Sequence, residues 1–187
     1  MANGELLTLA FYFMVFTEKL MPTAAQKCIS VLKHYKLTLA LAESVTSGLA
    51  AHDLAGTIGT SEVLMGAIVC YHENVKCGLL KVPKKMVQTF TCESIEVTER
   101  LAKNLKKCIK ADVYAAITGL AAPGASESAE KPVGTIFISV CFGKQVVNSR
   151  FRFYGSPLTV RKKAANALLE AVASVVSQWF IAPPRST

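Results

Sequence analysis

The chain has 187 residues, of which 51% are hydrophobic and 18% are charged. These values fit one globular domain and exclude disordered, collagen-like and low-complexity chains. The formal net charge of +8 favours an anionic ligand through long-range attraction, but it names no partner. Several cations recur on one expected helix surface, where a solvated face is a simpler interpretation than a nucleic-acid interface: Arg100, Lys103, Lys106, Lys107 and Lys110.

The two ends of the chain are expected to lie outside the folded domain. Residues 1–20 are interpreted as a poorly ordered N-terminal extension, and residues 183–187 as a short tail. The apolar stretch from Leu6 to Phe16 is too short to span a bilayer and lacks a basic leader and a cleavage pattern, so neither a membrane span nor a signal peptide is expected. The six cysteines form no CxxC pair, which indicates free thiols in a reducing cytoplasm.

The domain expected over residues 21–182 begins with a strand flanked by helices. Apolar residues recur at helical spacing over residues 23–35, which predicts an amphipathic helix that packs on a sheet. The apolar run at residues 37–42 predicts a buried strand, followed by a turn of small hydroxyl residues and a helix that ends near Gly56. A second strand is expected at residues 63–71.

The middle of the chain predicts another helix and another buried strand. Ser94 can cap a helix over residues 95–109, and residues 113–118 form an apolar run. Residues 119–132 break all periodicity with glycines, prolines and hydroxyl or acidic residues. This segment is therefore expected to be a long functional loop at the carboxyl end of a strand.

The C-terminal part predicts a β-hairpin and a final helix. Strands are expected at residues 135–142 and 146–153, on either side of the turn residues Gly143 and Lys144. Pro157 then opens a helix with one apolar face. Together the elements predict a single three-layer α/β/α domain with a mixed, mostly parallel sheet and an antiparallel hairpin edge.

Two hydroxyl-rich loops follow strands of this expected sheet. They occupy residues 44–48 and 118–124, and in open α/β sheets ligands bind beyond the carboxyl ends of strands. Small side chains in the first loop would let backbone amides at a helix start approach an anion closely. Ordinary helix capping by the same serine and threonine residues is the alternative.

A third candidate site combines Ser61 with Tyr71 and Lys76. A serine hydroxyl is a poor nucleophile until a base takes its proton, and a lysine can serve as that base when burial removes its charge. The rival bases are three histidines: His34, His52 and His72. No spaced cluster of His, Cys and carboxylate residues indicates a metal site.

Five segments of the chain resemble the CinA C-terminal domain family, which includes stand-alone nicotinamide-nucleotide amidases. They are AESVTSG (42–48), GTS (59–61), CYHENVK (70–76), ADVYAAITGLAAPG (111–124) and EKPVGTIFISV (130–140). The resemblance runs in order from about residue 24 to residue 175. The pair TGLAAPG and KPVGT is its most specific part.

The resemblance implies hydrolysis of the carboxamide of nicotinamide mononucleotide, which yields nicotinate mononucleotide and ammonia, by a Ser-Lys pair without a metal or cofactor. It assigns Ser61 as the nucleophile, Lys76 as its base and Tyr71 as a proton-relay or orienting group. It also implies a set of groups that position the nucleotide substrate: Ser44, Thr46, Gly48, Thr118 and Gly119. The backbone amides of Gly119 and Leu120 are candidate oxyanion donors.

The sequence departs from the family pattern at four places. His72 and Glu73 stand where the family's Tyr-Ser-Asn has serine and asparagine. Ser47 and Ala122 replace glycines, and the arginine of the family's Phe-Ser-Gly-Asp-Arg is absent from residues 153–157. Arg161, one turn into the last helix, is the candidate substitute for this anion-binding group. These departures favour the alternative of a catalytically inactive nucleotide-binding or protein-interaction module. The family resemblance also implies a homo-oligomer.

Overall fold

The computed structural model describes residues 21–181. The N-terminal extension expected at residues 1–20 and the tail expected at residues 183–187 therefore lie outside the described residues.

The first half of the fold follows the predicted order of elements. Helix α2 (Ala24–His34) is followed by strand β1 (Leu39–Glu43), helix α3 (Leu49–Ala55), a short 3-10 turn η1 (Thr60–Glu62) and strand β2 (Leu64–Val69). Thr23 caps α2, with its side chain accepting from the backbone N–H of Gln26. All five residues of β1 are buried, as expected for a central strand with both faces covered.

The second half adds two helices that the sequence pattern did not predict. The elements are α4 (Glu73–Gly78), α5 (Lys84–Phe90), α6 (Ile95–Leu105), β3 (Val113–Gly119), β4 (Thr135–Phe142), β5 (Gln145–Arg152) and α7 (Pro157–Ile181). Helices α4 and α5 have only six and seven residues, too few for a clear helical periodicity. The predicted cap of α6 is confirmed, since Ser94 Oγ accepts from the N–H of Val97 at 3.3 Å.

The sheet is mixed, with strand order β2-β1-β3-β4-β5. Strand β1 pairs in parallel with both β2 and β3, whereas β4 runs antiparallel to β3 and to β5. Only β4 therefore opposes the common direction of the other strands. The prediction of a mostly parallel sheet with an antiparallel hairpin at one edge is confirmed.

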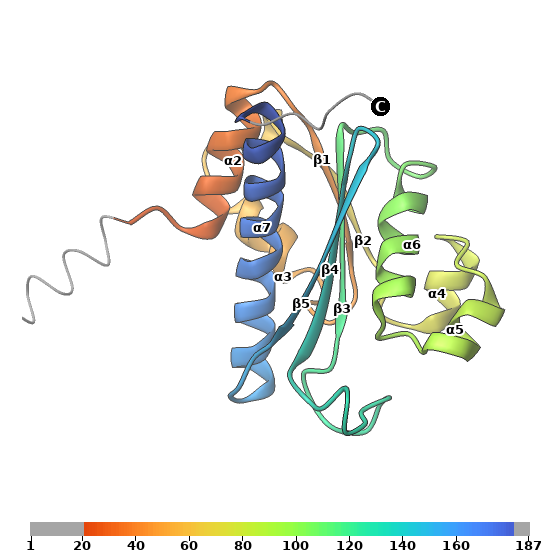
Figure 1. Ribbon diagram of the computed structural model, residues 1–187. Coiled ribbons are helices and arrows are strands. Elements are labelled where there is room, and N and C mark those ends of the chain that lie inside the picture. The colour runs from red at the N-terminus through yellow and green to blue at the C-terminus, as the bar shows by residue number, and fades with distance from the viewer. Residues whose placement is uncertain (1–20, 182–187) are drawn as a thin grey trace, which may run out of the picture.

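Helices cover both faces of the sheet and complete the three layers. Helices α2, α3 and α7 lie on one face, and α4, α5 and α6 lie on the other (Figure 1). Each face has its own apolar core: Leu41 and Ile117 belong to the first, and Ala40 and Ala116 to the second. This alternation along β1 and β3 follows from the two-residue period of a strand.

Helix α7 is long and apolar enough to cross a membrane by length and mean hydropathy. Its buried residues, which include Ala164, Leu168 and Val172, belong to the core shared with α2 and the sheet. Core packing accounts for this apolar composition.

Candidate functional site

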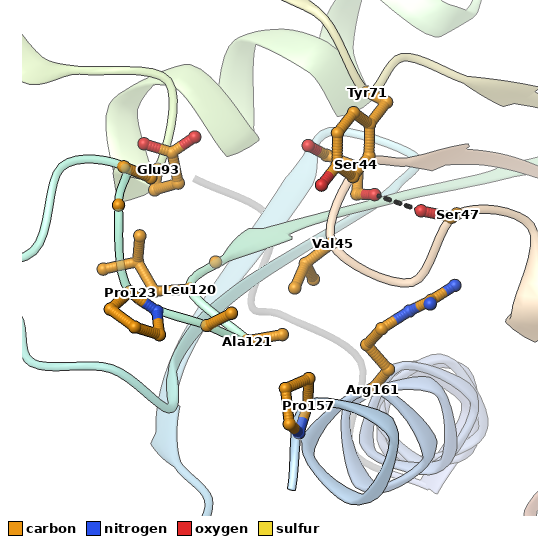
Figure 2. Close-up of a pocket in the computed structure, with 14 residues that line it drawn as sticks. Ser44, Val45, Ser47, Tyr71, Glu93, Leu120, Ala121, Pro123, Pro157 and Arg161 are labelled. Carbon is orange, nitrogen blue, oxygen red and sulfur yellow. Dashed lines mark hydrogen bonds between the residues drawn. The ribbon is translucent and has the colours of Figure 1, made fainter.

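The carboxyl ends of β1 and β3 border a cavity of about 530 Å³. Figure 2 shows its walls: Ser44 and Tyr71 on one side, the loop after β3 on another, and the start of α7 below. The lining residues are Ser44, Val45, Ser47, Tyr71, Glu93, the residues from Gly119 to Ala125, Pro157 and Arg161. The ligand crevice predicted between the two hydroxyl-rich loops is therefore present.

Lys76 contacts Ser44, which lines this cavity, from behind the cavity surface. The Lys76 side chain is fully buried, and its Nζ lies 3.0 Å from Ser44 Oγ. The same amine donates to two backbone carbonyls, Cys70 O at 2.8 Å and Tyr71 O at 3.0 Å. Three oxygen atoms thus surround Lys76 Nζ. They provide one acceptor for each of the three N–H groups of a charged ammonium.

The same geometry also suits an uncharged amine. A neutral –NH₂ group has two N–H donors for the Cys70 and Tyr71 carbonyls and directs its lone pair at Ser44 Oγ. In that state it can accept the serine proton, which is what a general base for a hydroxyl nucleophile must do.

The side chains of Ser44 and Lys76 meet because β1 and β2 end side by side. The Cys70 N–H donates to Glu43 O at 2.7 Å, so the residues after both strands leave the sheet side by side. Helix α4 then starts at once, with His72 as its N-cap accepting from the Asn74 N–H at 3.1 Å. Lys76 lies in this short helix, from which its side chain reaches Ser44.

The predicted contact between Ser61 and Lys76 is wrong. Ser61 lies exposed in η1, before the first residue of β2, whereas Lys76 follows the last residue of that strand. The six residues of β2, at about 3.3 Å each, separate the two positions by roughly 20 Å. Ser61 is not among the residues that line the cavity. Ser44, predicted only to position the ligand, is the hydroxyl that Lys76 contacts.

The start of α3 is not available to an anionic ligand, which corrects the expectation for the first loop. The fully buried carboxylate of Glu43 accepts from the backbone N–H groups of Gly48 at 3.0 Å, Ala50 at 3.2 Å and Ala51 at 2.9 Å. These bonds satisfy the free amides of the helix terminus. Gly48, with φ of +91°, supports this turn and does not line the cavity.

Two other residues predicted to position the ligand do not line the cavity. Thr118 is fully buried, and its hydroxyl shares a hydrogen bond of 2.7 Å with that of Thr98 in α6. Thr46 is also fully buried. The predicted oxyanion role of the Leu120 N–H is corrected as well, because this N–H donates to Thr135 O at 2.9 Å. Gly119 does line the cavity.

Arg161 provides a cation at the wall formed by α7. It lines the cavity, and its Nη2 donates to Thr46 O at 3.1 Å. Its buried Nε has no hydrogen-bond partner among the described residues. The arginine that the sequence suggested as a substitute therefore lines the cavity, and its buried Nε has no partner among the described residues.

The nearby thiol of Cys70 does not compete with the serine. Burial raises the pKa of the nearby Cys70 thiol to about 11, an effect that Lys76 partly opposes, so this thiol stays protonated at neutral pH. Within residues 21–181 no group of three or more His, Cys, Asp or Glu side chains is arranged to hold a metal ion.

Comparisons with known proteins identify one family. The model of the CinA C-terminal domain matches residues 22–176. A competence-damage inducible protein of Bacillus cereus (strain G9842) is 37% identical over 139 residues, which are 74% of this chain and 33% of that protein. The chain thus spans only 33% of the length of this relative, and 34% of a similar protein of strain B4264.

Solved structures with the same fold include a protein from Agrobacterium tumefaciens. It is the competence/damage inducible protein CihA, with a TM-score of 0.76 and 28% identity over 83% of this chain and 94% of that one. A CinA superfamily protein of Klebsiella pneumoniae has a TM-score of 0.79 with 23% identity, over 83% of this chain and 97% of that one. At that identity the second likeness shows the fold alone.

Proposed function

The chain belongs to the CinA C-terminal domain family, and from this membership together with the contact between Lys76 and Ser44 we propose that it is an amide hydrolase. The substrate class is a nucleotide that carries a carboxamide, and nicotinamide mononucleotide is the specific candidate. The observation that carries the proposal is the distance of 3.0 Å between Lys76 Nζ and Ser44 Oγ.

The reaction starts with the transfer of a proton from Ser44 Oγ to the neutral amine of Lys76. The serine oxygen attacks the carboxamide carbon and forms a tetrahedral intermediate with a negatively charged oxygen. Ammonia is a poor leaving group, so Lys76 returns its proton to the nitrogen as the C–N bond breaks. An acyl-enzyme and free ammonia result.

Water completes the cycle by the same route. Lys76 takes a proton from a water molecule, whose oxygen attacks the acyl carbon. The ester bond to Ser44 breaks, the serine oxygen recovers the proton from Lys76, and the carboxylate product leaves. One amine therefore serves both half-reactions as base and as acid.

Backbone amides beside Ser44 are our candidates for stabilising the oxyanion. The N–H groups of Val45 and Thr46 donate to no acceptor within the described residues. They follow the nucleophile directly in the chain, as one oxyanion donor does in other serine hydrolases. Tyr71, whose side chain lines the cavity beside Ser44, is the group that would orient the ring of the substrate.

Arg161 is our candidate for binding the phosphate. Its position on the cavity wall supports this role, since a guanidinium binds phosphate oxygens through paired hydrogen bonds. The expectations of a homo-oligomer and of a cytoplasmic location stay predictions.

Ammonia release from nicotinamide mononucleotide tests the proposal, and Arg161→Gln tests the phosphate site. We expect turnover by the wild-type protein, and a KM raised about tenfold or more in Arg161→Gln with little change in kcat, because the lost bond forms in the ground state as well. Lys162→Gln removes the neighbouring exposed cation of α7 and is the matched control, for which KM stays at the wild-type value. Tight binding of the nucleotide without any ammonia release would instead indicate the inactive binding module.

A further inference from the structure

Glu93 is a carboxylate in the cavity that the proposed reaction does not use. It lies between α5 and α6, immediately before Ser94, the N-cap of α6. It lines the cavity with Ser44 and Arg161, and Figure 2 shows it on the opposite side of the site from Arg161. The cavity therefore has a cation at one wall and a carboxylate at another.

A network of hydrogen bonds holds Glu93 in place. Its Oε2 accepts from the hydroxyl of Ser126 in the long loop after β3. Lys131 Nζ donates to Ser126 Oγ at 2.8 Å, to Glu93 O at 2.9 Å and to Thr91 Oγ1 at 2.6 Å. The loop and the start of α6 are thereby fastened to each other, so the carboxylate is fixed before any ligand enters.

The second oxygen of Glu93 is free. Its Oε1 accepts no hydrogen bond from the side chains or backbone of residues 21–181. A carboxylate oxygen is only an acceptor, so its complement on a ligand is a hydrogen-bond donor.

The ammonium of Lys131 partly compensates the charge of Glu93. Both groups hydrogen-bond to Ser126 Oγ; burial lowers the pKa of Lys131, and the negative charge of Glu93 acts in the opposite direction. A compensated carboxylate attracts a free cation less strongly, whereas it keeps its capacity to accept from neutral hydroxyl groups. Acidic side chains bind the hydroxyls of ribose in this way in dinucleotide-binding folds.

We infer that Glu93 is a specificity-determining residue that accepts hydrogen bonds from the free sugar hydroxyls of a nucleotide ligand. This inference rests on the proposed function, because it assumes that the reacting carboxamide lies at Ser44 and the phosphate at Arg161. The site then selects ribonucleotides over ligands that present a carboxamide and an anion without a hydroxylated sugar between them. A ligand that leaves the Glu93 oxygen unpaired is rejected, since an unpaired polar group in a binding site costs affinity.

Calorimetric binding to the Ser44→Ala protein tests the inference without turnover. The probes are nicotinamide mononucleotide and its analogue whose sugar lacks both free hydroxyls. We expect the parent Ser44→Ala protein to bind the ribonucleotide about tenfold or more tightly than the analogue. Adding Glu93→Gln, which keeps the size of the side chain, should weaken binding of the ribonucleotide and reduce this preference to about twofold, while the analogue binds as before. Glu130→Gln, at an exposed carboxylate of the long loop after β3 and outside the cavity, is the control and should leave the preference unchanged.

The outcomes separate this inference from the proposed reaction. The inference is overturned if Glu93→Gln keeps the preference for the ribonucleotide over the analogue. It is also overturned if Glu93→Gln loses the same affinity for both probes. That second result would indicate that Glu93 only positions the loop after β3. Absence of binding of either probe to the parent protein would overturn the inference and the nucleotide substrate together. The expected preference without ammonia release by the wild-type protein would overturn the amide hydrolase and leave sugar recognition in place.

Discussion

Ser44→Ala is expected to lower the rate of ammonia release from nicotinamide mononucleotide by about a thousandfold or more, because it removes the proposed nucleophile. Ser61→Ala should change the rate by less than about twofold, since surface substitutions far from a site have small effects. Steady-state kinetics on the two variants measures both values. The pair is well matched, because each change removes one hydroxyl group of the same chain.

The fold should survive both substitutions. Ser44 is buried and makes one side-chain contact with Lys76, while Ser61 is exposed in η1. A thermal melt close to that of the wild-type protein would show that a loss of activity in Ser44→Ala is chemical. Equal activity of Ser44→Ala and wild type would remove Ser44 from the mechanism.

Lys76→Met should lower kcat by about a hundredfold to ten-thousandfold, because it removes the group that we propose moves the proton in both half-reactions. Methionine keeps most of the length and apolar body of the buried lysine stem, so binding of the nucleotide should be retained. Ammonia release and calorimetric binding of the same ligand measure the two quantities.

Lys84→Met, at an exposed position of α5, is the control for this change and should behave as wild type. The Lys76 variant leaves the carbonyls of Cys70 and Tyr71 without their donor, which is expected to lower the melting temperature. A folded Lys76→Met protein with wild-type kcat would rule out lysine as the base.

The fold was largely predictable because its strongest signals are local. The buried run before Glu43 and the hairpin at Gly143 need no knowledge of the rest of the chain to be recognised. Helices α4 and α5 escaped prediction because each makes fewer than about two turns, which leaves no periodic stripe to detect.

The position of the cavity was predicted correctly, but the serine that contacts Lys76 was not. The rule that ligands bind at the carboxyl ends of strands placed Ser44 in the crevice, and the role of Lys76 as the base stays a prediction. Its partner was wrong because Ser61 precedes β2, and this strand carries the chain across the sheet. Two consequences of tertiary packing had no local signal: the Glu43 carboxylate on the start of α3, and Glu93 at the cavity wall.

The most direct test of the contact between Ser44 and Lys76 is the identification of the serine that a sulfonyl fluoride labels, by mass spectrometry of the digested protein. This measurement does not depend on the identity of the substrate, because the reagent modifies serines that a neighbouring base activates. The account predicts an adduct on Ser44 in the wild-type protein, a much slower reaction in Lys76→Met, and no adduct on Ser61. Labelling of Ser61, or equally fast labelling of Ser44 in Lys76→Met, would contradict it.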